Sequence, residues 1–100
     1  MDKEILIQET EASIVSLIEI TQNLQNGNKK QRKFAQTRLE KIFPQFDKNI
    51  GEAIDNFDIR SSQNQENIFS CREHIGKREY NQAIKLLQSY LPFKNFITYF

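Results

Sequence analysis

Apolar and polar positions alternate along most of the chain with the period of an α-helix. In the first segment apolar residues recur at three- and four-residue steps, at Ile7, Ile14, Leu17, Ile18 and Leu24. Asp2 can cap this helix and Gly27 can end it. The stretch from Ile14 to Ile20 is β-branched enough to resemble a strand. The length of the periodic window and the Gly27 stop predict a helix instead.

A second cap follows at Asn28, with Gln31 three residues later in the spacing of a capping box. The apolar residues after it keep one helical phase, at Ala35, Leu39, Ile42, Phe43, Phe46, Ile50, Ala53, Ile54 and Phe57. Pro44 lies inside this run and removes one backbone hydrogen bond, at a cost of ~3 kcal/mol in a helix interior. The run is therefore either one kinked helix or two helices that divide at Pro44. The unbroken phase favours the kinked or closely abutting arrangement.

Residues 58–62 interrupt the pattern, and Ser62 with Gln65 repeats the capping-box spacing. A narrow stripe of Ile68, Cys71 and Ile75 then leads to Gly76. The last clear helix is expected from about Glu79 to Leu91, where Pro92 stops it. Pro92 can also open a final helical turn, because Phe93, Phe96, Ile97 and Phe100 repeat at i, i+3, i+4 and i+7.

The expected fold class is all-α. We predict a single domain over residues 1–100, a small antiparallel bundle of about four main helices with a short aromatic C-terminal segment. The periodicity predicts a core of Ile14, Leu17, Leu24, Leu39, Ile42, Phe46, Ile50, Ile54, Ile68, Ile84 and Leu87.

Residues 71–91 resemble the middle of a tetratricopeptide repeat. Tyr80, Ala83, Leu87 and Leu91 match the tyrosine, small, large and leucine positions of that repeat, and Arg78 stands where the repeat usually has glycine. The match covers about a fifth of the chain, and no second copy is present. The resemblance implies a tight antiparallel helical hairpin and not a repeat array, which needs about three units.

Composition excludes several classes of protein. Fourteen basic and thirteen acidic residues nearly cancel, which argues against a protein dedicated as a whole to nucleic acid or to a membrane surface. A single cysteine excludes an internal disulfide framework and fits a reducing compartment. The first residues are acidic and no apolar run reaches secretory or membrane-spanning length, so we expect a cytoplasmic protein without a membrane span.

The residues that could perform catalysis are few. Cys71 and His74 lie three apart on one predicted helix and could form a thiolate–imidazole pair or half of a metal site. No second pair of ligands and no glycine-rich turn accompanies them. Glu52, Asp55 and Asp58 form an acidic ladder, but the Glu-x-x-His motif of di-metal bundles is absent. We therefore expect no catalytic residues, metal, cofactor or small-molecule substrate.

The densest cluster of charge is basic and comprises Lys29, Lys30, Arg32, Lys33, Arg38 and Lys41. These residues could neutralise phosphates near a helix start, although Phe34 is their one aromatic neighbour. The alternative is that Glu9, Glu11 and Glu19 of the first helix supply the counter-charge. In a short hairpin about Gly27, we expect Glu19 to face Arg32 and Lys33, and Glu11 to face Lys41.

Five of the eleven aromatic residues fall within the last eleven positions. The candidates for a partner-binding surface are Tyr90, Phe93, Phe96, Ile97, Tyr99 and Phe100. We expect this aromatic end to be buried, either on its own bundle or in the groove of a partner or a homodimer.

The pattern predicts a non-enzymatic protein that binds another protein, as a regulator, an adaptor or an immunity-type factor. In size and layout the expected bundle resembles the bacteriocin immunity proteins of Gram-positive bacteria, a resemblance of architecture and not of motif. The competing hypothesis is a nucleic-acid-binding bundle that uses the basic residues from Lys29 to Lys41.

Overall fold

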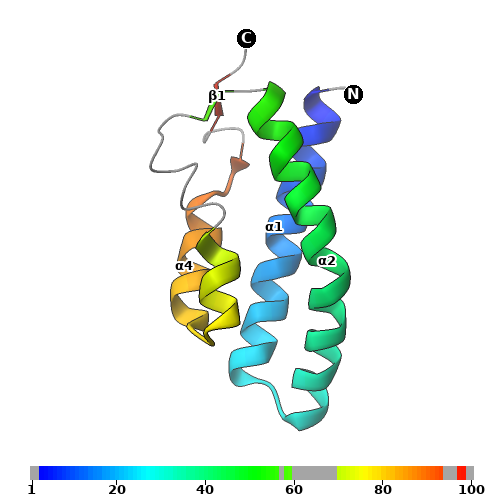
Figure 1. The fold of residues 1–100 in the computed structure, drawn as a ribbon, viewed down its shortest axis with the longest axis vertical. Helices are drawn as coiled ribbons and strands as arrows, with labels where there is room; N and C mark the ends of the chain where they lie inside the picture. Colours follow the sequence, from blue (N-terminus) through cyan, green and yellow to red (C-terminus); the bar gives the residue numbers. More distant parts are fainter. Residues whose placement is uncertain (1–2, 57, 60–69, 94–96, 99–100) are drawn as a thin grey trace.

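Two long helices form an antiparallel hairpin that makes up most of the protein (Figure 1). The computed structural model describes residues 3–56, 58–59, 70–93 and 97–98. Helix α1 spans Lys3–Asn26 and helix α2 spans Lys29–Asn56. The predicted helix across Ile14 to Ile20 is confirmed, because α1 runs through this stretch without a break.

The turn between α1 and α2 is built as the capping box predicts. The Asn28 side chain accepts a hydrogen bond from the backbone N–H of Gln31 at 2.8 Å, and the Gln31 side chain accepts one from the N–H of Asn28 at 2.9 Å. At Gly27 a Cβ atom would lie 2.4 Å from the carbonyl oxygen of Asn23. Glycine is therefore required here by close approach of the backbone.

Helix α2 continues through Pro44 and is not split there. Pro44 is exposed, and so is Glu40, the residue whose carbonyl group loses its helical donor. The continuous apolar phase across Pro44 explains why one helix forms, since Phe46 and Ile50 beyond it stay on the buried face. A kink at this position stays a prediction.

A second, shorter hairpin packs beside the first. Residues 70–76 are helical, residues 77–79 form a turn, and helix α4 spans Tyr80–Ser89. In Figure 1 this hairpin lies beside α1, and α4 contacts α1. A 2.5 Å hydrogen bond from the Gln25 side chain to Asn81 ties the start of α4 to the end of α1.

Helix α4 ends two residues earlier than the sequence predicts. The N–H groups of Tyr90 and Leu91 bond to Leu87 and Gln88, three residues back, at 3.2 Å each. Pro92 excludes Leu91 from the helical region, and the last turn tightens before it.

The core is a single cluster in which α1 is the central element. Of the predicted core, seven residues are buried, namely Ile14, Leu17, Leu24, Leu39, Phe46, Ile50 and Leu87. Ile42 and Ile84 are half-buried, and the side chains of Ile54 and Ile68 lie outside the described part of the chain. The helical period therefore identified seven of the nine core positions that can be compared.

One buried polar contact fixes the register of the long hairpin. The Asn49 side chain of α2 donates to the Ser13 hydroxyl at 2.9 Å and reaches the carbonyl oxygen of Glu9 at 3.4 Å. Asn49 is 4% exposed, so sliding the helices would leave its amide without these partners in an apolar environment. The contact thus selects one alignment of α1 against α2.

The predicted final helical turn is found only in part: Phe93 lies in a 3₁₀ turn, whereas Ile97 is extended. Ile97–Thr98 forms strand β2, which pairs antiparallel with strand β1, Asp58–Ile59, in the register Asp58 to Thr98 and Ile59 to Ile97. The i, i+3, i+4 pattern predicted the wrong backbone at Ile97. Ile and Thr are β-branched, and an extended partner after α2 gives their backbone hydrogen bonds that a short terminal helix would lack.

Candidate binding groove

An open groove lies between α2 and the short hairpin. Helix α4 contacts α1, and Arg72 of the short hairpin reaches Asp47 and Phe43 of α2. Two adjoining cavities of about 360 and 510 Å³ occupy this space and share Gln36, Arg78 and Tyr80 in their walls. We call the pair of cavities the basic groove.

The floor of the basic groove is apolar. Leu24 from α1, Leu39 from α2 and Ile75 from the helix at 70–76 reach it, and each is no more than 8% exposed. The rings of Phe43 and Tyr80 stand at its sides and are half-buried. The floor is apolar because it is the outer part of the core, to which each of the three helices contributes one residue.

The rim is strongly basic. Arg32 and Lys33 stand on the α2 side, and Arg72 and Arg78 on the side of the short hairpin. Glu40 is the single carboxylate among the lining residues. Within the described ranges no carboxylate lies at ion-pair distance from Arg32, Lys33 or Arg78. The groove therefore presents uncompensated positive charge above apolar surface.

Arg72 makes two contacts with α2. Its guanidinium lies 2.7 Å from the carboxylate of Asp47 and 5.0 Å from the centre of the Phe43 ring. The ion pair links α2 to the short hairpin at one end of the groove. Asp47 therefore offsets the charge of Arg72 within the groove.

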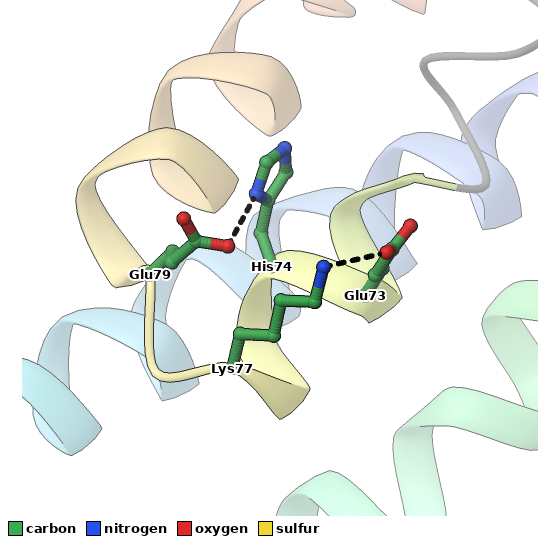
Figure 2. A network of polar contacts seen from close by, with 4 residues as sticks. All are labelled: Glu73, His74, Lys77 and Glu79. Carbon is green, nitrogen blue, oxygen red and sulfur yellow. Dashed lines mark hydrogen bonds and ion pairs between the residues drawn. The ribbon is translucent and has the colours of Figure 1, made fainter.

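The turn at 77–79 closes the short hairpin next to the groove (Figure 2). Lys77 bonds to Glu73 at 2.8 Å, and the Nδ1 atom of His74 lies 3.2 Å from Glu79. The hydrogen bond from Lys77 lowers the pKa of the Glu73 carboxyl and raises the pKa of Lys77. The side chains on both sides of Arg78 are thus engaged within the hairpin.

The six residues of the predicted basic cluster all lie on α2 but face different ways. Arg38 is half-buried, and Lys29, Lys30, Arg32, Lys33 and Lys41 are exposed. Arg32 and Lys33 line the basic groove, and Lys33 also lies with Lys30 beside the exposed ring of Phe34.

The predicted counter-charge from α1 is wrong for the described residues, which contain no ion pair between this cluster and Glu9, Glu11 or Glu19. The contact of Asn49 with Glu9 and Ser13 places Glu19 nearer the level of Glu40 than that of Arg32. Glu11 instead accepts a hydrogen bond from the backbone N–H of Phe93 at 2.7 Å.

The aromatic end is buried on the bundle where the structure describes it. Tyr90 is 1% exposed and Phe93 is fully buried, so neither is available at the surface of this chain. The backbone of Ile97 lies in strand β2. Phe96, Tyr99 and Phe100 lie outside the described residues, and a partner surface there stays a hypothesis.

Cys71 and His74 are not arranged as a reactive pair. Cys71 is fully buried, and burial raises the pKa of its thiol to about 12, so the thiolate is scarce at neutral pH. His74 meets Glu79 instead. Across the residues that can be placed, no group of three His, Cys, Asp or Glu side chains could hold a metal ion.

Sequence reasoning identified one wall of the groove and missed the other. It singled out Arg32 and Lys33 by their charge density, but Arg72, Arg78 and Tyr80 are distant in sequence and join them only through the packing of the short hairpin on α1. The signal that could have identified Arg78 was its place at the glycine position of the tetratricopeptide-like hairpin.

Comparison of the chain with protein-family models, with curated proteins and with solved structures finds no match. Among the helices that can be described, none is both long and apolar enough to cross a bilayer.

Proposed function

We propose that this chain is a non-enzymatic binding protein that takes an acidic, amphipathic helical segment of another protein into the basic groove. The observation that carries the proposal is the composition of the groove: Arg32, Lys33 and Arg78 stand around an apolar floor with Glu40 as the one lining carboxylate. The fourth cation, Arg72, is paired with Asp47. A regulator, an adaptor or an immunity-type factor would each act through such a contact.

The length of the groove fits a short helix. Along α2 its lining runs from Arg32 to Phe43, which corresponds to about 16 Å of helix axis. A helix of about three turns would lie along it, with apolar side chains at i, i+3, i+4 and i+7 on the floor. Carboxylates at the edges of that helix would meet Arg32, Lys33 and Arg78.

Apolar floor and basic rim contribute differently to binding. Burial of apolar side chains supplies most of the affinity, at about 25 cal/mol per Å² of surface removed from water. The rim charges mainly raise the association rate and reject basic or neutral segments. Binding should therefore weaken with salt but persist at moderate ionic strength.

The test uses a labelled peptide of fourteen residues in which Leu recurs at i, i+3, i+4 and i+7 and Glu and Ala fill the other positions. Fluorescence anisotropy at low salt should detect binding to the intact chain. The double substitution Arg32→Glu and Lys33→Glu should weaken it by roughly tenfold or more, since both side chains line the groove.

Two controls isolate the groove. The double substitution Lys48→Glu and Lys85→Glu makes the same change in net charge at exposed positions away from the cavities, and should leave affinity nearly unchanged. A peptide of the same composition with its leucines scattered should bind more weakly. Equal binding of both peptides, or no binding of either, would contradict the proposal.

A nucleic-acid-binding role is the second candidate, and one observation favours it. Phe34 is 66% exposed on the outer face of α2, with Lys30 and Lys33 beside it. An exposed ring between cations can stack on a base. If a single-stranded oligonucleotide binds and Phe34→Ala abolishes that binding, while the peptide does not bind, this candidate replaces the first.

A further inference from the structure

Arg78 occupies a backbone conformation that normally belongs to glycine. Its φ angle is 62°, in the left-handed region, and it is the one non-glycine residue with positive φ among those described. A side chain in this region meets the backbone and is disfavoured for any residue with a Cβ atom. The chain therefore keeps arginine at a position where glycine would be less strained.

The hydrogen bonds around the turn show why this conformation is required. The N–H of Glu79 bonds to the carbonyl of His74 at 2.8 Å, and the N–H of Arg78 bonds to that of Ile75 at 3.1 Å. This is the pairing of a Schellman motif, in which the residue at the position of Arg78 is usually glycine. The turn itself thus gives no reason for an arginine.

The place of the side chain suggests a reason. Arg78 is exposed and lines both cavities of the basic groove, at the point where they meet. Its neighbours Lys77 and Glu79 are bonded to Glu73 and His74 (Figure 2), and none of these four residues lines either cavity. Within the described part of the chain no carboxylate pairs with Arg78.

We infer that Arg78 is the specificity-determining residue of the basic groove and binds a carboxylate of the partner helix between its apolar anchors. This inference rests on the proposed function. A guanidinium can hold a carboxylate through two parallel hydrogen bonds, which fixes the position of that group as well as its charge. The strained backbone places this contact at the centre of the groove, with Tyr80 beside it.

The decisive variant is Arg78→Gly, because it separates binding from stability. Removing a Cβ atom from a left-handed position should leave the melting temperature unchanged or raise it. The same change should weaken binding of the leucine–glutamate peptide by roughly tenfold, through loss of the carboxylate contact. Arg78→Lys, which keeps a charge without the planar fork, should recover only part of the affinity.

Lys77→Gln is the matched control, since it removes one positive charge from the adjacent residue outside both cavities. It should leave peptide affinity unchanged. Each glutamate of the peptide is then replaced by glutamine in turn. One of these replacements should weaken binding to the intact chain but not to the Arg78→Gly variant, which is the result that a double-mutant cycle gives for a direct contact.

Each other outcome overturns the inference in a distinguishable way. If Arg78→Gly binds normally while the Arg32→Glu and Lys33→Glu variant does not, Arg78 is only a turn residue and the proposed function stands. If Arg78→Gly lowers stability and affinity together, the arginine is structural. If the intact chain does not bind the peptide, the proposed function and this inference fail together.

Discussion

At the scale of single residues, burial decides which side chains are reactive. Cys71 lies in the core beside the Asp47–Arg72 ion pair, and desolvation raises the pKa of its thiol from 9.0 to about 12. The same effect raises the pKa of the buried Tyr90 hydroxyl well above its ordinary value of 10.0. Both groups are therefore neutral in the folded state at physiological pH.

We predict that the free energy of unfolding falls as the pH rises above about 9. In the unfolded chain Cys71 loses its proton near pH 9, whereas the folded state keeps it until about pH 12. The unfolded state therefore binds fewer protons than the folded state between pH 9 and 12. The stability due to the neutral thiol is fully present below pH 9. Above pH 9 the free energy of unfolding falls by up to about 1.4 kcal/mol per pH unit.

Urea denaturation between pH 8 and 10 measures this slope, because Tyr90 contributes only above its ordinary pKa of 10.0. Cys71→Ala serves as the control: it lowers stability at every pH by loss of packing but should remove the slope between pH 9 and 10. A slope that survives in this variant would assign the alkaline loss to another group.

At the scale of helices, the two glycines of the long hairpin have opposite roles. Gly51 lies inside α2, and a Cβ atom added there would meet nothing within 4 Å. Gly27 lies in the turn, where a Cβ atom would be 2.4 Å from the backbone oxygen of Asn23 and 3.0 Å from Cβ of Gln31. Gly51 therefore only adds to the conformational entropy lost on folding, whereas Gly27 is required because a side chain would clash with the backbone.

Gly51→Ala should therefore raise the free energy of unfolding by about 0.5–1 kcal/mol, the difference between alanine and glycine in a helix interior. Gly27→Ala should lower it, because the backbone of the turn must shift. Chemical denaturation of the two variants side by side checks both signs. A loss of stability in Gly51→Ala would show that this helix face is packed more tightly than its open surroundings indicate.

The sequence predicted the helices well because local signals define them. The Asn28–Gln31 capping box, the Gly27 stop and the apolar phase across Pro44 each act within a few residues, and the structure contains all three. Strand β2 was missed because its pairing with Asp58 and Ile59 is about forty residues away in the chain. The spacing of apolar residues within one segment gives no information about a strand that pairs with it from a distant part of the chain.

The same distinction applies to the candidate groove. Arg32 and Lys33 stand out in the sequence because basic residues cluster around them. Arg72 and Arg78 become their neighbours only when the short hairpin packs on α1, a tertiary event that leaves no local signature. The sequence contained one indication of the left-handed backbone at Arg78, because this arginine stands where a tetratricopeptide-like hairpin usually has glycine.

At the scale of the whole molecule, the residues after α4 close the core. Phe93 is fully buried, and its N–H is held by the Glu11 carboxylate on α1. Strand β2 then pairs with β1 just beyond the end of α2. The far end of the chain therefore contacts the first helix and the segment that follows the second.

Phe93→Ala should lower the free energy of unfolding by about 3–5 kcal/mol, as expected for a fully buried phenylalanine. The matched control is Phe34→Ala, which removes the same atoms from a ring that is 66% exposed and should change stability by no more than about 0.5 kcal/mol. Thermal and urea denaturation of both variants give the comparison. Equal effects would mean that the last residues do not complete the core.

The bond between Glu11 and Phe93 joins residues 82 positions apart, and this separation has a consequence for the order of assembly. Contacts across the Gly27 turn close short loops, whereas those of α1 with α4 and Phe93 close loops of more than fifty residues, whose entropy cost is larger. The long hairpin should therefore form first, and on the ribosome it emerges well before Phe93. Until α4 arrives, the apolar face of α1 that it will cover stays open to water and to chaperones.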